Sequence, residues 1–391
     1  MELSLPILCL AAAAYSAVLV KFVRSAALGR GWLDRPHGRE GGPAYRAVPR
    51  IGGAGILGAL LVGLTIGAAC GPEEIDLTAL LAMSCIGVLV YAIGAVDDLR
   101  GVPAALKLAV LIGAALASNL LLSTGWVSLG GDSAPGAAIV LALGVAWLVA
   151  VPTAINFVDG LDGLAAGLST IAAVVIAVLG AIHGDATTTM MAATLAAATV
   201  GFWHHNSHPA RVFMGDGGAM LLGYLLAALS LRLLYTAGPA AFAAAAAALG
   251  WPLVDLAAAT VRRIRRRALF RGDADHLHHR LARRRGHAGA VARIHGVAVA
   301  LAAAPLLLFD RSFPFALAAL ILVWSARWLG RPPVTVPRWF AAGAAAASLG
   351  LMLLAADSPT GAAPTRRAPH SPVRLVLHAG GSGIASETGM P

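Results

Sequence analysis

Charged residues are scarce in this chain of 391 residues: they make up 12% of it, against 58% hydrophobic residues. Lysine is almost absent, because only two of the 29 basic residues, Lys21 and Lys107, are lysines. Cys9, Cys70 and Cys85 are too few to suggest a disulfide framework, and their spacing is not that of a metal site. These shortages exclude a soluble pair of domains and a disulfide-stapled fold.

Long apolar runs are what the chain has instead. About twelve runs of roughly 17–25 residues are long enough to cross a bilayer as helices, and they are continuous rather than alternating. They cover 3–23, 51–69, 78–95, 104–122, 137–155, 164–182, 186–203, 219–235, 239–258, 292–309, 313–330 and 339–356. We therefore expect an all-α polytopic membrane protein with about 11–12 transmembrane helices in residues 1–356. The polar tail over 357–391 is expected to be disordered.

The distribution of arginine predicts the orientation. The loops after the first and ninth runs hold most of the arginines, whereas the loops at 70–77, 123–136, 183–186 and 236–238 hold no lysine or arginine. Positively charged loops stay in the cytoplasm, so the odd-numbered loops are predicted to be cytoplasmic and the amino terminus to be outside. Arg232 and Arg311 are mild exceptions. The net charge of +10 then reflects topology, and we expect no nucleic-acid partner.

Five polar clusters all fall in loops predicted to be cytoplasmic, which places the expected active site on that face. Acids at a membrane edge are costly unless a cation or a reaction uses them. The clusters are Asp34-Arg35-Pro36 with Pro49-Arg50-Ile51-Gly52-Gly53, Asp97-Asp98-Leu99-Arg100 with Lys107, residues 156–163 (Asn-Phe-Val-Asp-Gly-Leu-Asp-Gly), residues 213–218 (Phe-Met-Gly-Asp-Gly-Gly) and Asp275-His276-Leu277-His278-His279-Arg280.

The acids suggest a site for a hard cation, although each has a simpler interpretation. Asn156, Asp159 and Asp162 are spaced three apart, which would keep them near one helix face, and they could cap the run that follows. Asp97-Asp98 and Asp216 could each belong to an ordinary solvated turn. Taken together, these carboxylates favour Mg²⁺, which binds carboxylate oxygens, water and a substrate phosphate.

Basic side chains provide the opposite charge. His276, His278, His279 and Arg280 lie in a stretch with ten arginines between 262 and 285, which favours phosphate over Zn²⁺. A retention loop with incidental histidines is the alternative. Lys107 could hold a phosphate or simply extend to the membrane interface. Asp255 is expected to pair with Arg262 or Arg263.

Asp-Asp-x-Arg, Asn-x-x-Asp-Gly-x-Asp-Gly, Phe-Met-Gly-Asp and His-x-His-His-Arg, in this order, resemble the polyprenyl-phosphate N-acetylhexosamine-1-phosphate transferases of glycosyltransferase family 4. Residues 273–281 are similar to the WecA/TagO branch rather than to the related phospho-MurNAc-pentapeptide transferases. The resemblance spans about residues 1–330.

The resemblance implies transfer of a sugar-1-phosphate, most simply GlcNAc-1-phosphate, from a UDP-N-acetylhexosamine to undecaprenyl or decaprenyl phosphate. UMP is released and Mg²⁺, or Mn²⁺, is required. This is the first membrane step of a cell-envelope polysaccharide such as lipopolysaccharide O-antigen or teichoic acid, in the bacterial inner membrane. A homodimer is left open.

Residue roles carried over by the resemblance are as follows. Asp216 would be the principal metal ligand, with Asp97 and Asp98 beside the metal and the lipid phosphate. Asn156 and Asp159 would hold the nucleotide, with Asp162 nearby, and Phe213 would stack on uracil. Lys107 would bind a phosphate. The diphosphate or sugar end would be bound by His276, His278, His279 and Arg280.

One segment departs from the family. Residues 39–46 carry Glu40 where the family usually has a base, and no histidine follows. This puts the first loop's substrate contacts in question. The alternatives are another sugar such as a 6-deoxy-N-acetylhexosamine, a lipid or glycan transporter, or an inactive scaffold. Clustering of the polar groups at one face disfavours a transporter.

Overall fold

A computed structural model of the protein describes residues 4–33, 48–70, 74–122, 134–266 and 276–309. These residues are helical and form no β-sheet. The runs predicted at 313–330 and 339–356, the tail over 357–391 and the divergent segment 39–46 lie outside the described residues. So do Asp34 and Asp275.

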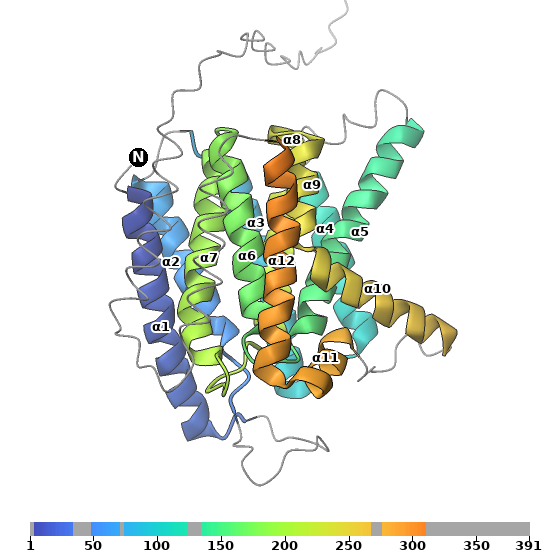
Figure 1. The fold of residues 1–391 in the computed structure, drawn as a ribbon. Coiled ribbons are helices and arrows are strands. Elements are labelled where there is room, and N and C mark those ends of the chain that lie inside the picture. The colour runs from blue at the N-terminus through green and yellow to red at the C-terminus, as the bar shows by residue number, and fades with distance from the viewer. Residues whose placement is uncertain (1–3, 34–47, 71–73, 123–133, 267–275, 310–391) are drawn as a thin grey trace, which may run out of the picture. The chain divides into compact units, whose positions relative to one another are not determined.

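Figure 1 shows the helices packed side by side in one bundle. Their bounds are α1 Ser4–Arg30, α2 Gly53–Cys70, α3 Leu77–Arg100, α4 Ala104–Leu122, α5 Ala134–Val158, α6 Leu164–Ile182, α7 Ala186–Asn206, α8 Gly215–Thr236, α9 Pro239–Ala248, α10 Gly250–Arg265, α11 Leu277–Arg285 and α12 His287–Phe309. Six of the described helices are long and apolar enough to cross a bilayer, or seven if the bent pair α9–α10 is one span. The predicted all-α polytopic membrane protein is confirmed.

One predicted run is not a single helix. The run 239–258 is divided into α9 and α10, which meet at Leu249 with a bend of 70°. Pro252 explains the break, because a proline ring clashes with the carbonyl four residues earlier in a continuous helix. In the first turn of α10 its missing N–H costs nothing, since N–H groups there have no helical partner. The break sends α10 away from the bundle (Figure 1).

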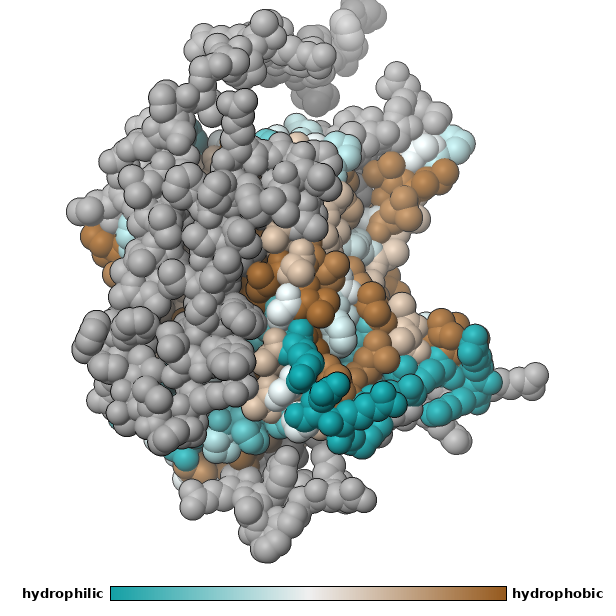
Figure 2. All heavy atoms as spheres, in the orientation of Figure 1, coloured by the Kyte–Doolittle hydropathy of each residue, from teal (hydrophilic) through white to brown (hydrophobic). Residues whose placement is uncertain are grey.

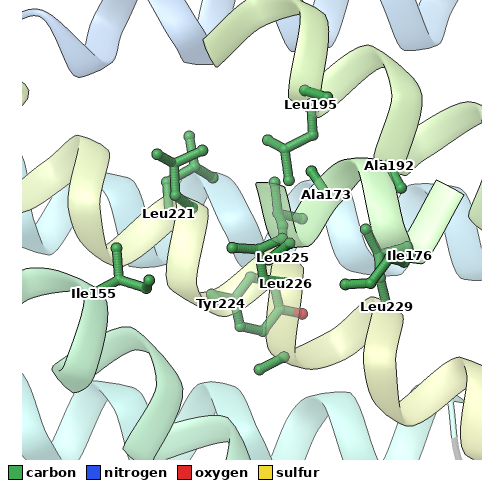
Figure 3. Close-up of a cluster of buried hydrophobic side chains, with 14 of the residues drawn as sticks. Ile155, Ala173, Ile176, Ala192, Leu195, Leu221, Tyr224, Leu225, Leu226 and Leu229 are labelled. Carbon is green, nitrogen blue, oxygen red and sulfur yellow. The ribbon is translucent and has the colours of Figure 1, made fainter. Parts of the chain in front are cut away.

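The core lies around α6, α7 and α8. Figure 3 shows side chains from α5, α6, α7 and α8 meeting there, among them Ile155, Ile176, Leu195 and Tyr224. In α6 and α8 almost every residue is buried, so these helices are hydrophobic on all sides. By contrast, α1 and α4 expose many large apolar side chains, as expected of helices that face lipid.

Glycines bring α2, α3 and α8 unusually close at one end. A β-carbon on Gly94 of α3 would lie 2.5 Å from the backbone nitrogen of Gly217 in α8. A β-carbon on Gly53 of α2 would lie 2.4 Å from the α-carbon of Gly218. Small residues permit this backbone contact between helices. As a result, the last turn of α3 meets the first turn of α8, and the acids of both are brought together.

Candidate active site

Side chains from four helix ends make up one polar cluster, which we call the acidic end of the bundle. It contains Asp97 and Asp98 from the last turn of α3, Lys107 from the first turn of α4, Asp159 after α5, and Asp216 from the first turn of α8. Asp97 and Asp216, which both bind Lys107, are 119 positions apart in the sequence. The structure therefore brings the predicted acids together.

Lys107 joins two of the carboxylates. Its Nζ lies 2.6 Å from Asp97 Oδ2 and 3.0 Å from Asp216 Oδ2. Asp97 is held further by the backbone N–H of Val102, which donates to its other oxygen at 2.5 Å. The ammonium points into the site, so simple extension to the membrane interface does not describe this lysine. A positive charge thus lies where two carboxylates converge.

Asp98 serves a different purpose from its neighbour. Its two oxygens accept hydrogen bonds from the backbone N–H groups of Asp216 at 3.0 Å and Gly217 at 3.2 Å. The start of α8 has no side-chain cap of its own, so Asp98 caps it from another helix. Sequence reasoning missed this role, because a cap is normally sought within a few residues of its helix.

Gly215 is required where α8 begins. Its φ is +76°, and a β-carbon there would lie 2.0 Å from the carbonyl oxygen of Arg50 and 2.5 Å from Asp98 Oδ2. Backbone hydrogen bonds join the same two segments, with Phe213 N–H donating to Pro49 O and Gly52 N–H donating to Phe213 O. The Phe-Met-Gly-Asp and Pro-Arg-Ile-Gly-Gly motifs therefore form one unit. The ring of Phe213 is partly exposed, and its predicted stacking on uracil remains a prediction.

Asn156, Asp159 and Asp162 do not share a helix face, so that prediction is wrong. Asn156 lies in the last turn of α5, and the two acids lie in the turn between α5 and α6. The capping interpretation is also wrong, because the N-cap of α6 is Gly163, which lies in the left-handed region with φ 73°, and no side chain caps the helix. Gly160 and Gly163 interrupt the helix before any three-residue spacing can align the acids.

The two acids of this turn have distinct environments. Burial raises the pKa of Asp159 well above its ordinary value, and the nearby carboxylates of Asp216 and Asp98 raise it further. Asp162 points toward the α7–α8 connection, where it accepts from His208 Nδ1 at 2.7 Å and from the N–H of Ala210 at 3.1 Å. Asp159 thus belongs to the acidic end, and Asp162 anchors a loop beside it.

Asn206 and His208 are site-supporting residues that sequence reasoning missed. The buried side chain of Asn206 accepts from Gly163 N–H and donates to the carbonyl of Val212, both at 2.9 Å. It therefore ties the start of α6 to the connection between α7 and α8, just before Phe213. Its position just before His208-Pro209 and the Phe-Met-Gly-Asp motif was the signal that could have identified it.

The histidines divide into buried and accessible members. His276 and His278 are 7% and 0% exposed, whereas His279 is partly exposed and Arg280 is exposed. The predicted pairing of Asp255 with Arg262 or Arg263 is wrong: Asp255 Oδ2 instead accepts from His278 Nδ1 at 2.5 Å. The bend at Leu249 causes this, because it turns α10 so that Asp255 meets the start of α11. Arg263 lies over the ring of Phe157.

The histidine segment contacts the turn that carries Asp159. A β-carbon at Gly160 would lie 2.7 Å from His278 Nε2 and 2.9 Å from His279 Nε2. Figure 2 shows hydrophilic residues gathered along the lower edge over α10 and α11, with apolar surface directly above them. Exposed arginines contribute to this edge, among them Arg265, Arg266, Arg283, Arg284 and Arg285. Basic and acidic motifs therefore meet at the same end of the bundle.

The donor set suits a hard divalent cation. Asp97 and Asp216 direct carboxylate oxygens toward a common point, where the ammonium of Lys107 now supplies the positive charge. Oxygen ligands of this kind are preferred by Mg²⁺. Both oxygens of Asp98 are engaged by backbone N–H groups, so Asp98 fits the role of a metal ligand less well than the other two.

A second charged cluster lies at the opposite end of α8, which we call the far end. Arg232 binds Asp185 through Nε at 3.0 Å and Asp76 through Nη1 at 2.9 Å. Asp76 caps α3 and Asp185 caps α7 through hydrogen bonds to backbone N–H groups. Arg232, an exception in the distribution of arginine, is thus neutralised by two acids.

Comparison with known proteins follows the same motifs. A family model described as glycosyl transferase family 4 matches residues 80–234, which include the acids of the acidic end. The chain is 30% identical over 321 residues to a probable undecaprenyl-phosphate N-acetylglucosaminyl 1-phosphate transferase of Bacillus subtilis, covering 80% of this chain and 83% of that relative.

Two further relatives carry different activities in their names. A decaprenyl-phosphate N-acetylglucosaminephosphotransferase of Mycobacterium tuberculosis is 35% identical over 273 residues, covering 60% of this chain and 65% of the relative. A phospho-N-acetylmuramoyl-pentapeptide-transferase of a Synechococcus species is 31% identical over 251 residues, covering 59% and 67%. The chain is therefore a transferase that belongs to glycosyl transferase family 4.

Proposed function

We propose that this protein transfers GlcNAc-1-phosphate from UDP-GlcNAc to a polyprenyl phosphate and releases UMP. The observation that carries the proposal is the acidic end, where carboxylates from separate helices converge on Lys107 at the end of an apolar bundle. The names of the Bacillus and Mycobacterium relatives support the sugar and the lipid acceptor. Such a site has no use in a protein that only scaffolds others, since uncompensated acids there are costly.

The reaction exchanges one phosphoryl bond for another. An oxygen of the lipid phosphate forms a new bond to the β-phosphorus of the UDP-sugar. The bond between this phosphorus and the bridging oxygen breaks, and its electron pair leaves with UMP. Phosphoryl transfer of this kind depends on positioning and on neutralising charge.

Mg²⁺ would be held by Asp216 and Asp97, and when bound it would neutralise the diphosphate of the donor. Asp98 fixes the first turn of α8 and so orients Asp216. With a metal's positive charge at these two carboxylates, the ammonium of Lys107 would be able to bind a phosphate oxygen instead. Such an exchange would explain why Lys107 lies between two carboxylates.

The remaining predicted residues are assigned to the donor substrate. Asn156, Asp159 and the ring of Phe213 would bind the nucleotide, and Asp162 anchors the loop beside Asp159. His279 and Arg280 offer accessible basic groups for the diphosphate or sugar end. An aspartate acting as base and an aspartate acting as nucleophile are both compatible with this arrangement. GlcNAc-1-phosphate bound covalently to the enzyme in the absence of acceptor, with release of UMP, would select the second route.

The same geometry supports the proposed acceptor and the proposed membrane face. The acidic end lies at the ends of helices that can cross a bilayer, which is where the phosphate of a membrane-bound polyprenol would be found. Arginines near α10 and α11 support placing this end on the cytoplasmic face of a bacterial inner membrane, where a nucleotide sugar would be available.

The direct test uses purified protein with polyprenyl phosphate and a panel of donors: UDP-GlcNAc, UDP-GalNAc, UDP-MurNAc-pentapeptide and a UDP-6-deoxy-N-acetylhexosamine. We expect UMP and polyprenyl-diphosphate-GlcNAc, detected by mass spectrometry, with UDP-GlcNAc preferred. Chelation by EDTA should stop the reaction, and Mg²⁺ should restore it. If UMP were released only with another donor, the proposed sugar would be wrong. If no donor of the panel gave UMP, the proposed function would be refuted.

A further inference from the structure

We propose that Asp255 and His278 form a buried brace that positions the accessible part of the histidine motif, His279 and Arg280, against the Gly160 turn. The effect of the brace on the KM for UDP-GlcNAc rests on the proposed function. Its effect on protein stability rests on packing alone. It separates the motif into two positioning histidines and two basic groups that face the donor substrate. It also gives a role to Asp255, which no motif includes.

Burial excludes direct contact between the brace and solvent. Asp255 and His278 are both 0% exposed, and His276 is 7% exposed. A charged carboxylate is expensive to bury without partners, and here the partners are imidazoles. Asp255 Oδ2 lies 2.5 Å from His278 Nδ1, and its Oδ1 lies 3.4 Å from His276 Nδ1. The carboxylate therefore fixes the orientation of the His278 ring through the nitrogen farther from the site.

The same carboxylate holds the start of α11. Asp255 Oδ1 accepts the backbone N–H of Leu277 at 3.0 Å, and the N-cap residue His276 provides no side-chain hydrogen bond. Asp255 thus caps α11 from the neighbouring helix α10, as Asp98 caps α8 from α3. Helix α11 and the ring of His278 are both placed by one side chain.

The brace ends at the turn that carries Asp159. His278 Nε2 is buried, has no hydrogen-bond partner among the described residues, and faces Gly160 at the distance of a tight contact. The adjacent His279 packs against the same glycine through its own Nε2 but is partly exposed. Moving the ring of His278 would therefore move His279 relative to the turn.

Two substitutions of His278 separate positioning from direct substrate contact. In asparagine the amide nitrogen takes the place of Nδ1, and in glutamine it takes the place of Nε2. His278→Asn therefore keeps the hydrogen bond to Asp255, whereas His278→Gln keeps a group where Nε2 was. Asp255→Asn completes the set, because its Oδ1 can still cap Leu277 while its amide nitrogen cannot accept the Nδ1 proton of His278.

We expect His278→Asn to keep the KM for UDP-GlcNAc within about threefold of the wild type, with kcat nearly unchanged. His278→Gln and Asp255→Asn should each raise that KM by about tenfold, as losses of orienting partners do. The KM for polyprenyl phosphate should not change. Asp255→Asn should add little in a His279→Ala background, because both act on the same contact.

The Tm, measured by thermal unfolding in detergent, tests the brace without requiring that the enzyme be active. The Tm of His278→Asn should lie above those of His278→Gln and Asp255→Asn by a few °C. Retained KM and Tm in His278→Gln, with losses in His278→Asn, would overturn the brace in favour of direct contact by Nε2. An unchanged Tm and KM in Asp255→Asn would overturn it as well.

Failure of the proposed function would look different. Wild-type protein would then release no UMP from any donor, while the order of Tm values would still decide whether the brace exists. Gly113→Ala is a control for the kinetic measurement, because nothing lies within 4 Å of a β-carbon at that position of α4.

Discussion

The two ends of α8 both carry acidic and basic side chains, but they combine them in different ways. At the far end, Arg232 is shared by Asp76 and Asp185, and both acids also cap helices. At the acidic end, four carboxylates gather near Lys107, with Arg50 adding a second positive charge close by. Both ends hold more carboxylates than basic groups, two against Arg232 at the far end and four against Lys107 and Arg50 at the acidic end. The excess of negative charge is larger at the acidic end, where we propose that a cation binds.

The largest expected effect comes from removing a carboxylate from the acidic end. Asp97→Asn should lower kcat by about 10³-fold, because the metal loses a ligand and Lys107 loses its closest partner. UMP release over a range of Mg²⁺ concentrations measures this, and the Mg²⁺ dependence should shift upward. Full activity at ordinary Mg²⁺ would show that Asp97 belongs with the structural acids.

Lys107→Met should reduce kcat/KM by about 10²-fold, because a phosphate loses its bound ammonium. The variant should fold, since removing a cation from a site with bound Mg²⁺ leaves the carboxylates neutralised. The chain's other lysine provides the control: Lys21→Met, on the exposed surface of α1, should change neither parameter. Equal activity of both variants would remove Lys107 from the site.

Gly160→Ala should raise the KM for the nucleotide sugar by about tenfold. Its added methyl would meet His278 Nε2 and His279 Nε2 at less than 3.0 Å, so the turn and α11 must separate. Steady-state kinetics with each substrate varied in turn measures the effect, which should fall on the donor alone. An equal rise in the KM for the lipid would contradict the assignment of this contact to the donor side.

The smallest effect on catalysis is expected at the far end. Asp185→Asn should leave kcat within about twofold while costing roughly 2–3 kcal/mol of stability, because Arg232 loses the buried carboxylate that it binds. Burial alone would raise the pKa of Asp185, but hydrogen bonds from Thr188 and the charge and hydrogen bonds of Arg232 outweigh it and lower that pKa.

The sign of the pH dependence follows from that lowered pKa. The charged Asp185 stabilises the folded state above its unfolded pKa of about 4, and this contribution is lost as the pH falls through the lower folded value. The difference in Tm between wild type and Asp185→Asn should therefore be full at pH 7 and shrink below about pH 4. A difference that grows on acidification would contradict the ion pair.

Local sequence patterns were enough to predict the helices. They also predicted that the polar motifs lie at one end of the helix bundle. Continuous apolar runs marked nearly every described helix, and counting loops placed Asp97, Asp159 and Asp216 together. The pattern could not show the break at Leu249, because the Ala-rich run continues through it and only Pro252 hints at a change of direction.

Long-range pairing was beyond what the sequence could show. The partners of Asp98, Asp255 and Asn206 lie on other helices, so no spacing rule connects them. Asp255 was assigned to nearby arginines because they are its neighbours in sequence, whereas the bend of 70° presents it to His278. Hydrophobic periodicity specifies which face of a helix is buried, but it does not specify which helix end meets which.

The most direct test of the contrast between the two ends is one assay on two matched variants. Wild type, Asp216→Asn and Asp185→Asn are purified in parallel, and UMP release from UDP-GlcNAc with undecaprenyl phosphate and Mg²⁺ is measured. We predict that Asp216→Asn loses at least about 10³-fold in kcat and that Asp185→Asn retains wild-type turnover. Equal turnover by Asp216→Asn and wild type, or comparable losses in both variants, would contradict the assignment of the acidic end as the active site.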